Sequence, residues 1–311
     1  MQVPSTISGT ETPSRLSFGI KTIPQRTSYE EILRVWREAD AVALIEHAWL
    51  WDHLMPFRGD PRGPMFEGWT LLAALAARTE RLGLGLMVAS NQYRPPAILA
   101  KVAATVDVVS GGRLVFGIGA GGTQFAGLPA EAEGFGLTLP SHRDALEQLA
   151  EACTLIRRLW SEPEPLDFDG QHYRLAGAIC EPKPVQSRVP ILMGGWGERM
   201  LRIVAEHADL WNMPGPPHFG LAQVRDKSAA LDEQCAAIGR DPAMIVRSVQ
   251  QTVDVDDPAA TRAALLELID IGVHHLVLNL PQPYPHAQWL AEQIVEPVLA
   301  QAPVAGIRDR P

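Results

Sequence analysis

Residues 82–120 read LGLGLMVASNQYRPPAILAKVAATVDVVSGGRLVFGIGA, and this stretch decides the fold. An apolar run over 82–89 is followed by a segment of helical spacing over 95–109 and by a second apolar run over 114–120. Near-continuous apolar runs are typical of parallel strands that are covered on both faces. The stretch therefore predicts a strand, a crossover helix and a second strand parallel to the first.

The same alternation continues along most of the chain. Strands are predicted at 18–21, 47–52, 82–89, 114–120, 191–194, 210–213, 245–255 and 274–280, and helices at 28–43, 68–79, 95–109, 141–160, 198–207, 219–238, 258–271 and 286–300. Eight strands that alternate with eight helices are the count of a closed (β/α)₈ TIM barrel. A doubly wound open sheet is the alternative, but no shift in composition divides the chain into two domains. We therefore expect an α/β fold of the barrel type, with its chemistry at the C-terminal ends of the strands.

Two segments interrupt the repeat and are predicted to be insertions. Residues 121–140 contain Gly and Pro without a clear period, and Ser141 is placed to cap the helix that follows. Residues 166–175 contain Asp169-Gly170 between two short apolar runs, which predicts a surface hairpin. We expect residues 1–15 to be a disordered tail, 16–302 a single barrel domain, and 303–311 a C-terminal tail.

The composition excludes several classes of partner. The 311 residues include 27 Lys+Arg and 36 Asp+Glu, and a net charge of −9 argues against nucleic acid or an anionic membrane as the main partner. No apolar run approaches the roughly 20 residues of a membrane span, and no signal peptide is recognisable, so a cytoplasmic protein is expected. The three cysteines lie far apart without a CxxC, and no residue spacing indicates a metal site.

The strand at 47–52 leads into candidate catalytic residues. Asp52 can accept a hydrogen bond from a cofactor, and His53 can donate or accept a proton near neutral pH. The alternative is a helix-capping Asp beside an exposed loop His. The aromatic side chains nearby either form the wall of an apolar substrate pocket or pack the loop onto the barrel rim; they are Trp49, Trp51, Phe57, Phe66 and Trp69.

Two glycine-rich segments follow predicted strands. Residues 117–122 (GIGAGG) have the GxGxxG spacing, but no helix begins inside them and Leu137 stands where a Rossmann motif needs an acidic residue. Close approach of the backbone to a flat ligand is the simpler role. Residues 194–197 (GGWG) directly precede a helix, where free N–H groups can bind phosphate, although turn geometry alone can also require glycine. Together they favour a phosphorylated cofactor.

With these motifs the sequence resembles the luciferase-like family of flavin-dependent oxidoreductases, and within it the branch that uses the deazaflavin coenzyme F420. The resemblance extends from about residue 16 to 299. It is carried by the segments WDH at 51–53, RLGLG at 81–85, YRPP at 93–96, GGRL at 111–114, GIGAG at 117–121, IRRLW at 156–160 and PILMGG at 190–195.

The resemblance implies a (β/α)₈ barrel with insertions, F420 as the cofactor and a set of site residues. Asp52 would contact the deazaflavin ring and His53 would be the catalytic proton-transfer residue. A non-proline cis peptide would support the ring from behind, and the matching bond is Gly85–Leu86. The remaining cofactor-binding residues would be Val88 and Asn91 along the ring, Gly121 and Gly122 after the fourth strand, and Gly194, Gly195, Trp196 and Gly197 at the phosphate. Trp49, Trp51, Phe57 and Trp69 would line the substrate pocket.

One departure concerns the substrate. Where the sugar-phosphate dehydrogenases of this branch carry a Glu, this chain has Gly122. With few Lys or Arg in the candidate pocket, we expect a small, neutral and rather apolar substrate instead.

Three functions remain open. The first is an F420-dependent oxidoreductase, which the shortage of lysine supports weakly because an arginine excess is typical of the GC-rich bacteria in which F420 is common. The second is an FMN-dependent monooxygenase that uses reduced flavin and O₂, and the third a non-catalytic flavin-binding barrel. A homodimer is expected from the resemblance, with a flavin or F420 reductase as a functional partner.

Overall fold

A computed structural model describes residues 15–57, 59–121, 128–163 and 165–302. The predicted tails are described at Arg15 alone, and Gly122 also lies outside the described residues. The central sheet contains β1 (Ser17–Lys21), β2 (His47–Leu50), β3 (Gly83–Leu86), β4 (Ala89–Ser90), β5 (Phe116–Gly119), β8 (Ile191–Gly194), β9 (Leu210–Pro214), β10 (Val246–Thr252) and β11 (His275–Asn279). Its strand order is β3-β2-β1-β11-β10-β9-β8-β5-β4, and every pair of neighbours in this order is parallel. The two end strands, β3 and β4, are consecutive in the chain.

The sheet closes where the third predicted strand divides into β3 and β4. The Leu84 N–H donates to the Arg113 carbonyl at 3.0 Å, and the Val115 N–H donates to the Leu84 carbonyl at 2.8 Å. These bonds join β3 to the residues just before β5, while β4 pairs with β5 itself. The architecture is therefore the closed (β/α)₈ barrel that the alternation predicted.

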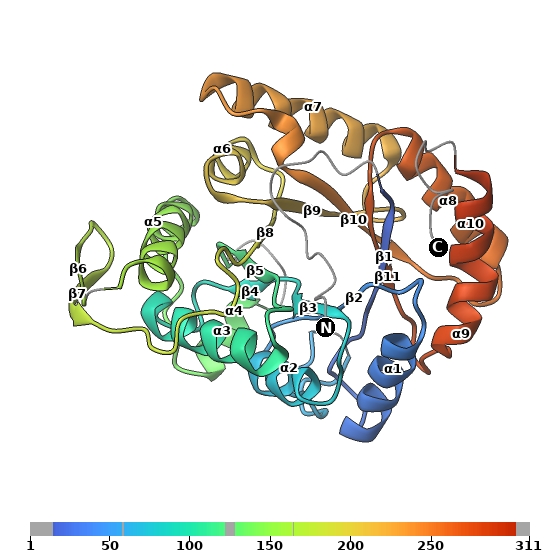
Figure 1. Cartoon of the computed structure of the whole chain (residues 1–311), viewed down its shortest axis with the longest axis horizontal. Coiled ribbons are helices and arrows are strands. Elements are labelled where there is room, and N and C mark those ends of the chain that lie inside the picture. The colour runs from blue at the N-terminus through green and yellow to red at the C-terminus, as the bar shows by residue number, and fades with distance from the viewer. Residues whose placement is uncertain (1–14, 58, 122–127, 164, 303–311) are drawn as a thin grey trace.

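Helices surround the strands on the outside (Figure 1). They are α1 (Tyr29–Ala41), α2 (Gly68–Ala76), α3 (Pro96–Ser110), α5 (His142–Ser161), α6 (Glu198–His207), α7 (Leu221–Ala237), α8 (Pro258–Asp270), α9 (Ala287–Leu290) and α10 (Glu296–Gln301), with a π-helical segment at Ala291–Val295 between the last two and a 3₁₀ turn at Pro242–Met244. Ser28 caps α1 and Ser141 caps α5, each accepting a backbone N–H three residues on. The buried positions of α1, Ile32, Val35, Trp36 and Ala39, recur at helical spacing.

Both predicted insertions contain regular structure. Residues 121–140 include a short helix, α4 (Leu128–Gly134). The sequence did not predict this helix, because the segment shows no clear period. The predicted hairpin is confirmed as β6 (Leu166–Asp169) and β7 (Arg174–Ala178), which pair antiparallel. In Figure 1 this hairpin projects at the left edge, beyond α5.

The barrel has two hydrophobic cores. A large one lies between strands and helices, and a smaller one fills the barrel interior with Trp49, Met87, Val115, Leu192, Leu210, Val246 and Val277. Trp49 occupies the space that Gly85 leaves, because a Cβ on Gly85 would lie 2.7 Å from the Trp49 ring. This part of the interior is thus packed solid, and a ligand can enter from the strand ends.

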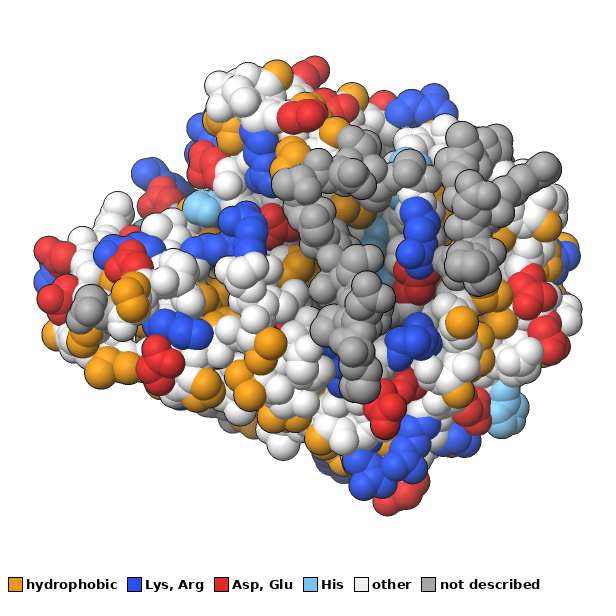
Figure 2. Space-filling model, viewed as in Figure 1, with side chains coloured by type: hydrophobic (Ala, Val, Ile, Leu, Met, Phe, Trp, Pro, Cys, Tyr) orange, Lys and Arg blue, Asp and Glu red, His pale blue; other side chains and the backbone are white. Residues whose placement is uncertain are grey.

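The surface carries no broad field of one charge on the face shown in Figure 2, where acidic and basic side chains are interspersed. None of the described helices combines the length and the apolar character needed to cross a bilayer.

Candidate active site

His53 lies just past the C-terminal end of β2. Side chains alternate along the strand, so Trp49, Trp51 and His53 share one side of the chain while Leu50 and Asp52 share the other. The His53 imidazole is 18% exposed and lies 5.0 Å from the ring centroids of both Trp51 and Phe57. Trp51, His53 and Phe57 therefore form one aromatic cluster at the mouth of the barrel.

The partner of His53 is a carboxylate from the insertion. Glu131, on α4, accepts from His53 Nδ1 at 3.0 Å and from the Tyr93 hydroxyl at 2.8 Å, both through Oε2. Its other oxygen accepts the backbone N–H groups of Leu54 and Met55. Because a carboxylate can only accept here, Nδ1 of His53 carries a proton, and Nε2 is left to exchange one with a ligand.

The electrostatics keep this carboxylate ionised. Burial raises the pKa of Glu131, but hydrogen bonds from His53 and from the Leu54 N–H outweigh it and hold the pKa below its usual range. Burial, with Glu131 beside it, raises the pKa of Tyr93, so its hydroxyl stays protonated and donates. A buried anion next to a His is the arrangement that favours the imidazolium when a proton arrives.

Asp52 has a different position from the one expected. Its side chain is fully buried on the opposite side of the chain, where both oxygens accept from Arg94, at 2.7 and 2.9 Å. Oδ2 also accepts the Ser90 N–H at 3.1 Å. Burial raises the pKa of Asp52, and Arg94 opposes that shift. Glu67, the N-cap of α2, also pairs with Arg94. Asp52 thus anchors Arg94 and Ser90, and its expected contact with the ring stays a prediction.

Two of the predicted pocket residues also lie elsewhere. Trp49 is fully buried in the barrel interior, and Trp69 is 2% exposed and packs against Phe116. Trp49 is part of the barrel packing because it lies within β2, two residues before Trp51 at the mouth. Trp69 is part of it because it lies on α2, which covers the sheet from outside. Trp51 and Phe57 are the two predicted aromatics that the structure brings to His53.

The non-proline cis peptide is present but lies two residues later than expected. It joins Met87 to Val88, between β3 and β4, and the Gly85–Leu86 bond is not cis. Gly85 lies under Trp49, and the Leu86 side chain is fully buried in the main core, with its Cδ1 only 3.3 Å from where a Cβ on Gly68 of α2 would lie. Gly85 and Leu86 are therefore not at the site.

Val88 forms a small apolar platform that glycines flank. A Cβ on Gly119 of β5 would lie 2.9 Å from Val88 Cγ2, and one on Gly194 of β8 would lie 3.6 Å from both Val88 methyls. Side chains at these two positions would compete with Val88 for the same space. The platform is flat because its neighbours have no side chains, which suits a planar ring.

The glycines after β8 lead into the N-terminus of α6. Gly195 has φ +125°, in the region that favours glycine, and Gly197 is the N-cap of α6 with no side-chain cap. A Cβ on Gly197 would meet no atom within 4 Å. The space beside the N-cap of α6 is therefore open, as an anion site requires. Trp196 packs edge-on against Phe219 beside this turn.

A chain of hydrogen bonds crosses the barrel interior below the mouth. Lys21 Nζ, at the end of β1, donates to Gln250 Oε1 at 2.6 Å and lies 5.7 Å from the Trp51 ring centroid. Gln250 donates to Asn212 Oδ1 at 2.6 Å, and Asn212 donates to Ser248 Oγ at 2.8 Å. Ser248 Oγ lies 2.8 Å from His275 Nδ1, and the His275 ring stacks on His47 at 3.9 Å.

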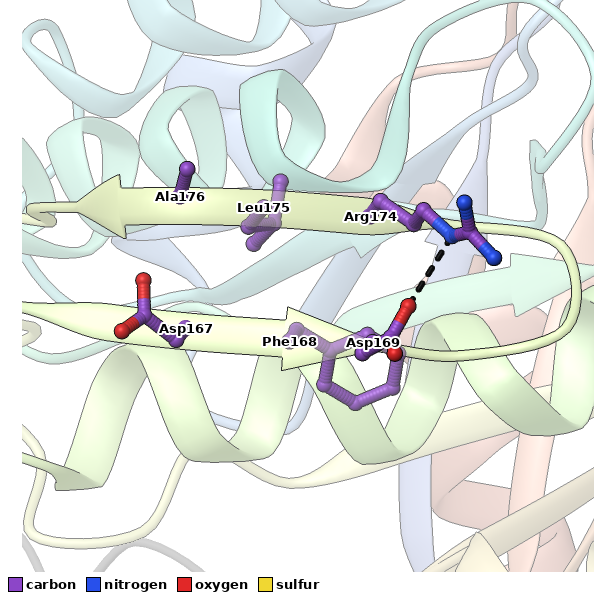
Figure 3. Close-up of a pocket in the computed structure, with 6 residues that line it drawn as sticks. All are labelled: Asp167, Phe168, Asp169, Arg174, Leu175 and Ala176. Carbon is purple, nitrogen blue, oxygen red and sulfur yellow. Dashed lines mark ion pairs between the residues drawn. The ribbon is translucent and has the colours of Figure 1, made fainter.

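Two surface hollows lie outside this arrangement. One of about 450 Å³ lies on the β6–β7 hairpin, where Arg174 pairs with Asp169 at 2.9 Å (Figure 3). Another of about 400 Å³ is lined by Leu54 and Met55, next to His53, and by Phe135 just after α4. The first is remote from the strand ends and contains no residue of the site.

The match to a family model agrees with this geometry. The model of the luciferase-like monooxygenase family matches residues 8–300. The chain belongs to that family. Members of the luciferase-like monooxygenase family among curated proteins include an F420-dependent glucose-6-phosphate dehydrogenase of Kineococcus radiotolerans, 31% identical over 69% of this chain and 61% of its own length. An F420-dependent hydroxymycolic acid dehydrogenase of Mycobacterium tuberculosis is 28% identical over 95% of this chain and 79% of its own.

Solved structures show the same fold. An F420-dependent secondary alcohol dehydrogenase, in complex with an F420-acetone adduct, aligns with a TM-score of 0.78 at 17% identity and covers 91% of this chain and 99% of its own. At that identity the likeness establishes the luciferase-like barrel and no more.

Sequence reasoning missed three residues that this luciferase-like barrel brings to its mouth. Glu131 lies in an aperiodic insertion, Arg94 meets Asp52 across 42 residues of sequence, and Lys21 ends the first strand. Two of them had a usable signal: Lys21 is a lone charge at a strand end, and Glu131 stands between two alanines before a Gly. Arg94 stands in the YRPP segment that carries the resemblance, but its contact with Asp52 joins distant segments, which only the closed barrel brings together.

Proposed function

We propose that this chain is an F420-dependent oxidoreductase in which His53 exchanges a proton with the substrate through Nε2. The observations that carry the proposal are the His53–Glu131 pair and the Val88 platform, which both lie at the C-terminal ends of the strands. The curated relatives described above support the choice of cofactor, since both are named as F420-dependent although they act on different substrates.

The residues at the mouth fit a planar, phosphorylated cofactor. Within the described part of the chain, Trp51 Nε1 and Asn91 Oδ1 are buried without a hydrogen-bond partner, so a donor and an acceptor are available to a polar ring edge. Val88 offers the flat face, and Gly194, Gly195 and Gly197 leave room for a phosphate at α6. Gly121 has φ +76° and continues the glycine edge of β5.

When bound, F420 supplies a carbon that gives or accepts a hydride. The chain's own residues hold it against Val88, bind its phosphate with the first turn of α6, and move the proton that accompanies the hydride. In oxidation of an alcohol, neutral His53 accepts the hydroxyl proton at Nε2 while Glu131 stabilises the imidazolium; in reduction of a ketone the imidazolium returns it. Trp51 and Phe57 exclude water from the reacting centre.

A cofactor titration tests the proposal. The purified protein should quench F420 fluorescence at micromolar concentration and ignore FMN, and a panel of secondary alcohols, ketones, enones and imines should then reveal turnover. His53→Ala should bind F420 as the wild type does and lose turnover. Preference for FMN would support the monooxygenase alternative, and F420 binding without turnover on any panel compound would support the non-catalytic barrel.

We also propose that the protein forms a homodimer. Apolar side chains are exposed on α3 and on the segment that follows β7, including Ile98 at 57%, Ile179 at 66% and Val185 at 60%. Light scattering should give twice the 33.9 kDa mass of one chain. A mass of 33.9 kDa at micromolar concentration would contradict this.

A further inference from the structure

Lys21 differs from the other lysines of the chain in where its ammonium lies. Lys101 donates to the Glu181 carbonyl, Lys183 lies 3.7 Å from a Glu181 carboxylate oxygen, and Lys227 lies on the outer helix α7. Lys21 instead ends β1, with Nζ bound to Gln250 from β10 and positioned near the Trp51 ring. The side chain therefore lies in the barrel mouth and contacts Trp51, which in turn contacts His53.

No carboxylate among the described residues neutralises this ammonium. Within the described residues no carboxylate lies within 4.0 Å of Lys21 Nζ, whereas Arg94 at the same mouth is neutralised by Asp52 and Glu67. The groups that contact Lys21 from β10 and from the end of β2 are an amide and an indole, both uncharged. Burial lowers the pKa of Lys21 from 10.5 to about 8. A desolvated cation without a partner is costly, and a ligand can remove that cost by supplying an anion.

We propose that Lys21 binds a negatively charged oxygen of the ligand that occupies the barrel mouth. The oxygen belongs either to the deazaflavin ring or to an acidic group of the substrate. For the first source the inference rests on the proposed F420 chemistry; for the second it does not. Lys21 remains an ammonium throughout, so His53 keeps the proton transfer and Lys21 supplies the charge.

The lysine content makes this directly measurable. The chain has four lysines, at positions 21, 101, 183 and 227, so protein labelled with ¹³Cε-lysine gives four lysine resonances. Lys21→Met removes one of them and thereby assigns it. In the ligand-free protein the Lys21 resonance should titrate near pH 8.

Two titrations distinguish the sources of the oxygen. In the first, F420 alone is added to the protein. In the second, acetate and acetone, which have the same shape but differ in charge, are each added up to about 100 mM to the ligand-free and to the F420-loaded protein. A rise of about one pH unit or more in the Lys21 midpoint with F420 assigns the oxygen to the cofactor. A rise with acetate and not with acetone assigns it to the substrate side. If neither F420 nor acetate moves the midpoint, the proposal is overturned.

Matched variants complete the test. Lys21→Met should weaken the binding of whichever ligand moves the midpoint by about tenfold or more, and Lys21→Arg, which keeps the charge, should restore part of it. Lys227→Met removes an ammonium from an outer helix and should change nothing. Equal loss in both Met variants would overturn the assignment. Failure of the wild type to bind F420 would overturn the proposed function, while the acetate titration of ligand-free protein would still decide the role of Lys21.

Discussion

Glu131 is the side chain that determines what His53 can do. It accepts from Nδ1, so it fixes the tautomer and stabilises the imidazolium. We therefore expect Glu131→Gln to lower kcat by roughly 100-fold and to leave F420 affinity unchanged. The loss should fall on kcat while the KM for F420 stays at the wild-type value, a split that a merely structural defect would not give.

Glu133→Gln is the matched control, because Glu133 lies on the same helix and is exposed. It should have wild-type kinetics. If Glu131→Gln kept the wild-type kcat, His53 would work without this carboxylate and the pair would be a packing contact.

Lys21 makes a prediction about stability that is opposite in sign to its predicted effect on binding. Its pKa is lower in the folded state than in the unfolded chain, so at pH 7 the folded protein holds an ammonium at a cost. Stability associated with this group rises with pH through 8 towards 10.5. Lys21→Met should therefore raise the free energy of unfolding of the ligand-free protein at pH 7 by about 1 kcal/mol. Denaturant melts would show this, and a destabilised variant would mean that the bond to Gln250 outweighs the charge.

Among the elements, α6 and α7 allow a paired test of the phosphate site. Both begin at a glycine N-cap of nearly the same conformation, Gly197 with φ −71° and ψ 151° and Gly220 with φ −70° and ψ 160°. A Cβ on Gly197 would meet no atom within 4 Å, and one on Gly220 would lie 4.0 Å from Gln223 Oε1. Gly197→Ala should leave the melting temperature within 1 °C of a Gly220→Ala variant but weaken F420 binding about tenfold, because its methyl group enters the space in front of the α6 N–H groups.

Fluorescence titration with F420 measures this, and Gly220→Ala should bind as the wild type does. Equal affinities in the two variants would place the phosphate elsewhere. Weaker folding of Gly197→Ala would show that its surroundings are less open than the structure describes.

The elements also show which local signals in a sequence are reliable. The Ser141 cap, the Asp169-Gly170 hairpin and the bounds of α6 were all predictable, because each depends on neighbours in the chain. The resemblance placed the cis peptide at Gly85–Leu86, whereas those residues are ordinary strand and the cis bond is Met87–Val88. Helix α4 was missed because seven residues are too few to show a period.

At the scale of the whole molecule, acid should weaken the fold through the stacked pair in the barrel interior. Burial lowers the pKa of His275 to about 4 and, together with His275, lowers that of His47 well below its usual value. Both are neutral in the folded state at pH 7. Their contribution is complete above pH 6.5 and is lost progressively as the pH falls towards 4, by up to about 3 kcal/mol for His275.

Urea melts at intervals from pH 8 to pH 4 measure this loss. His275→Gln should reduce the fall in the free energy of unfolding between pH 6.5 and pH 4. His142→Gln, which removes an exposed imidazole, should not. An unchanged acid side in His275→Gln would show that other groups cause the loss.

The barrel was predictable as a whole and its site only in part. Alternation of apolar runs and helical segments is repeated eight times, so single errors in bounds do not change the outcome. The position of His53 followed from the rule about strand ends. That His53 faces the mouth while Asp52 pairs with Arg94 depends on the direction of each side chain, which the sequence does not show. The pairing of His53 with Glu131 is a contact across 78 residues of sequence, which no local pattern contains.

The chain of hydrogen bonds in the barrel interior has an orientation, and Lys21 sets it. An ammonium has no lone pair, so Gln250 must turn its carbonyl oxygen to Lys21 and its NH₂ to Asn212. Asn212 must then donate to Ser248, which leaves the Ser248 hydroxyl proton for Nδ1 of His275 and the ring proton of that imidazole on Nε2. One donor-only group at the mouth thus determines the orientation of two amides and the tautomer of a histidine near the opposite end of the strands. A carboxylate at position 21 could only accept, so the direction of every hydrogen bond in this chain would have to reverse.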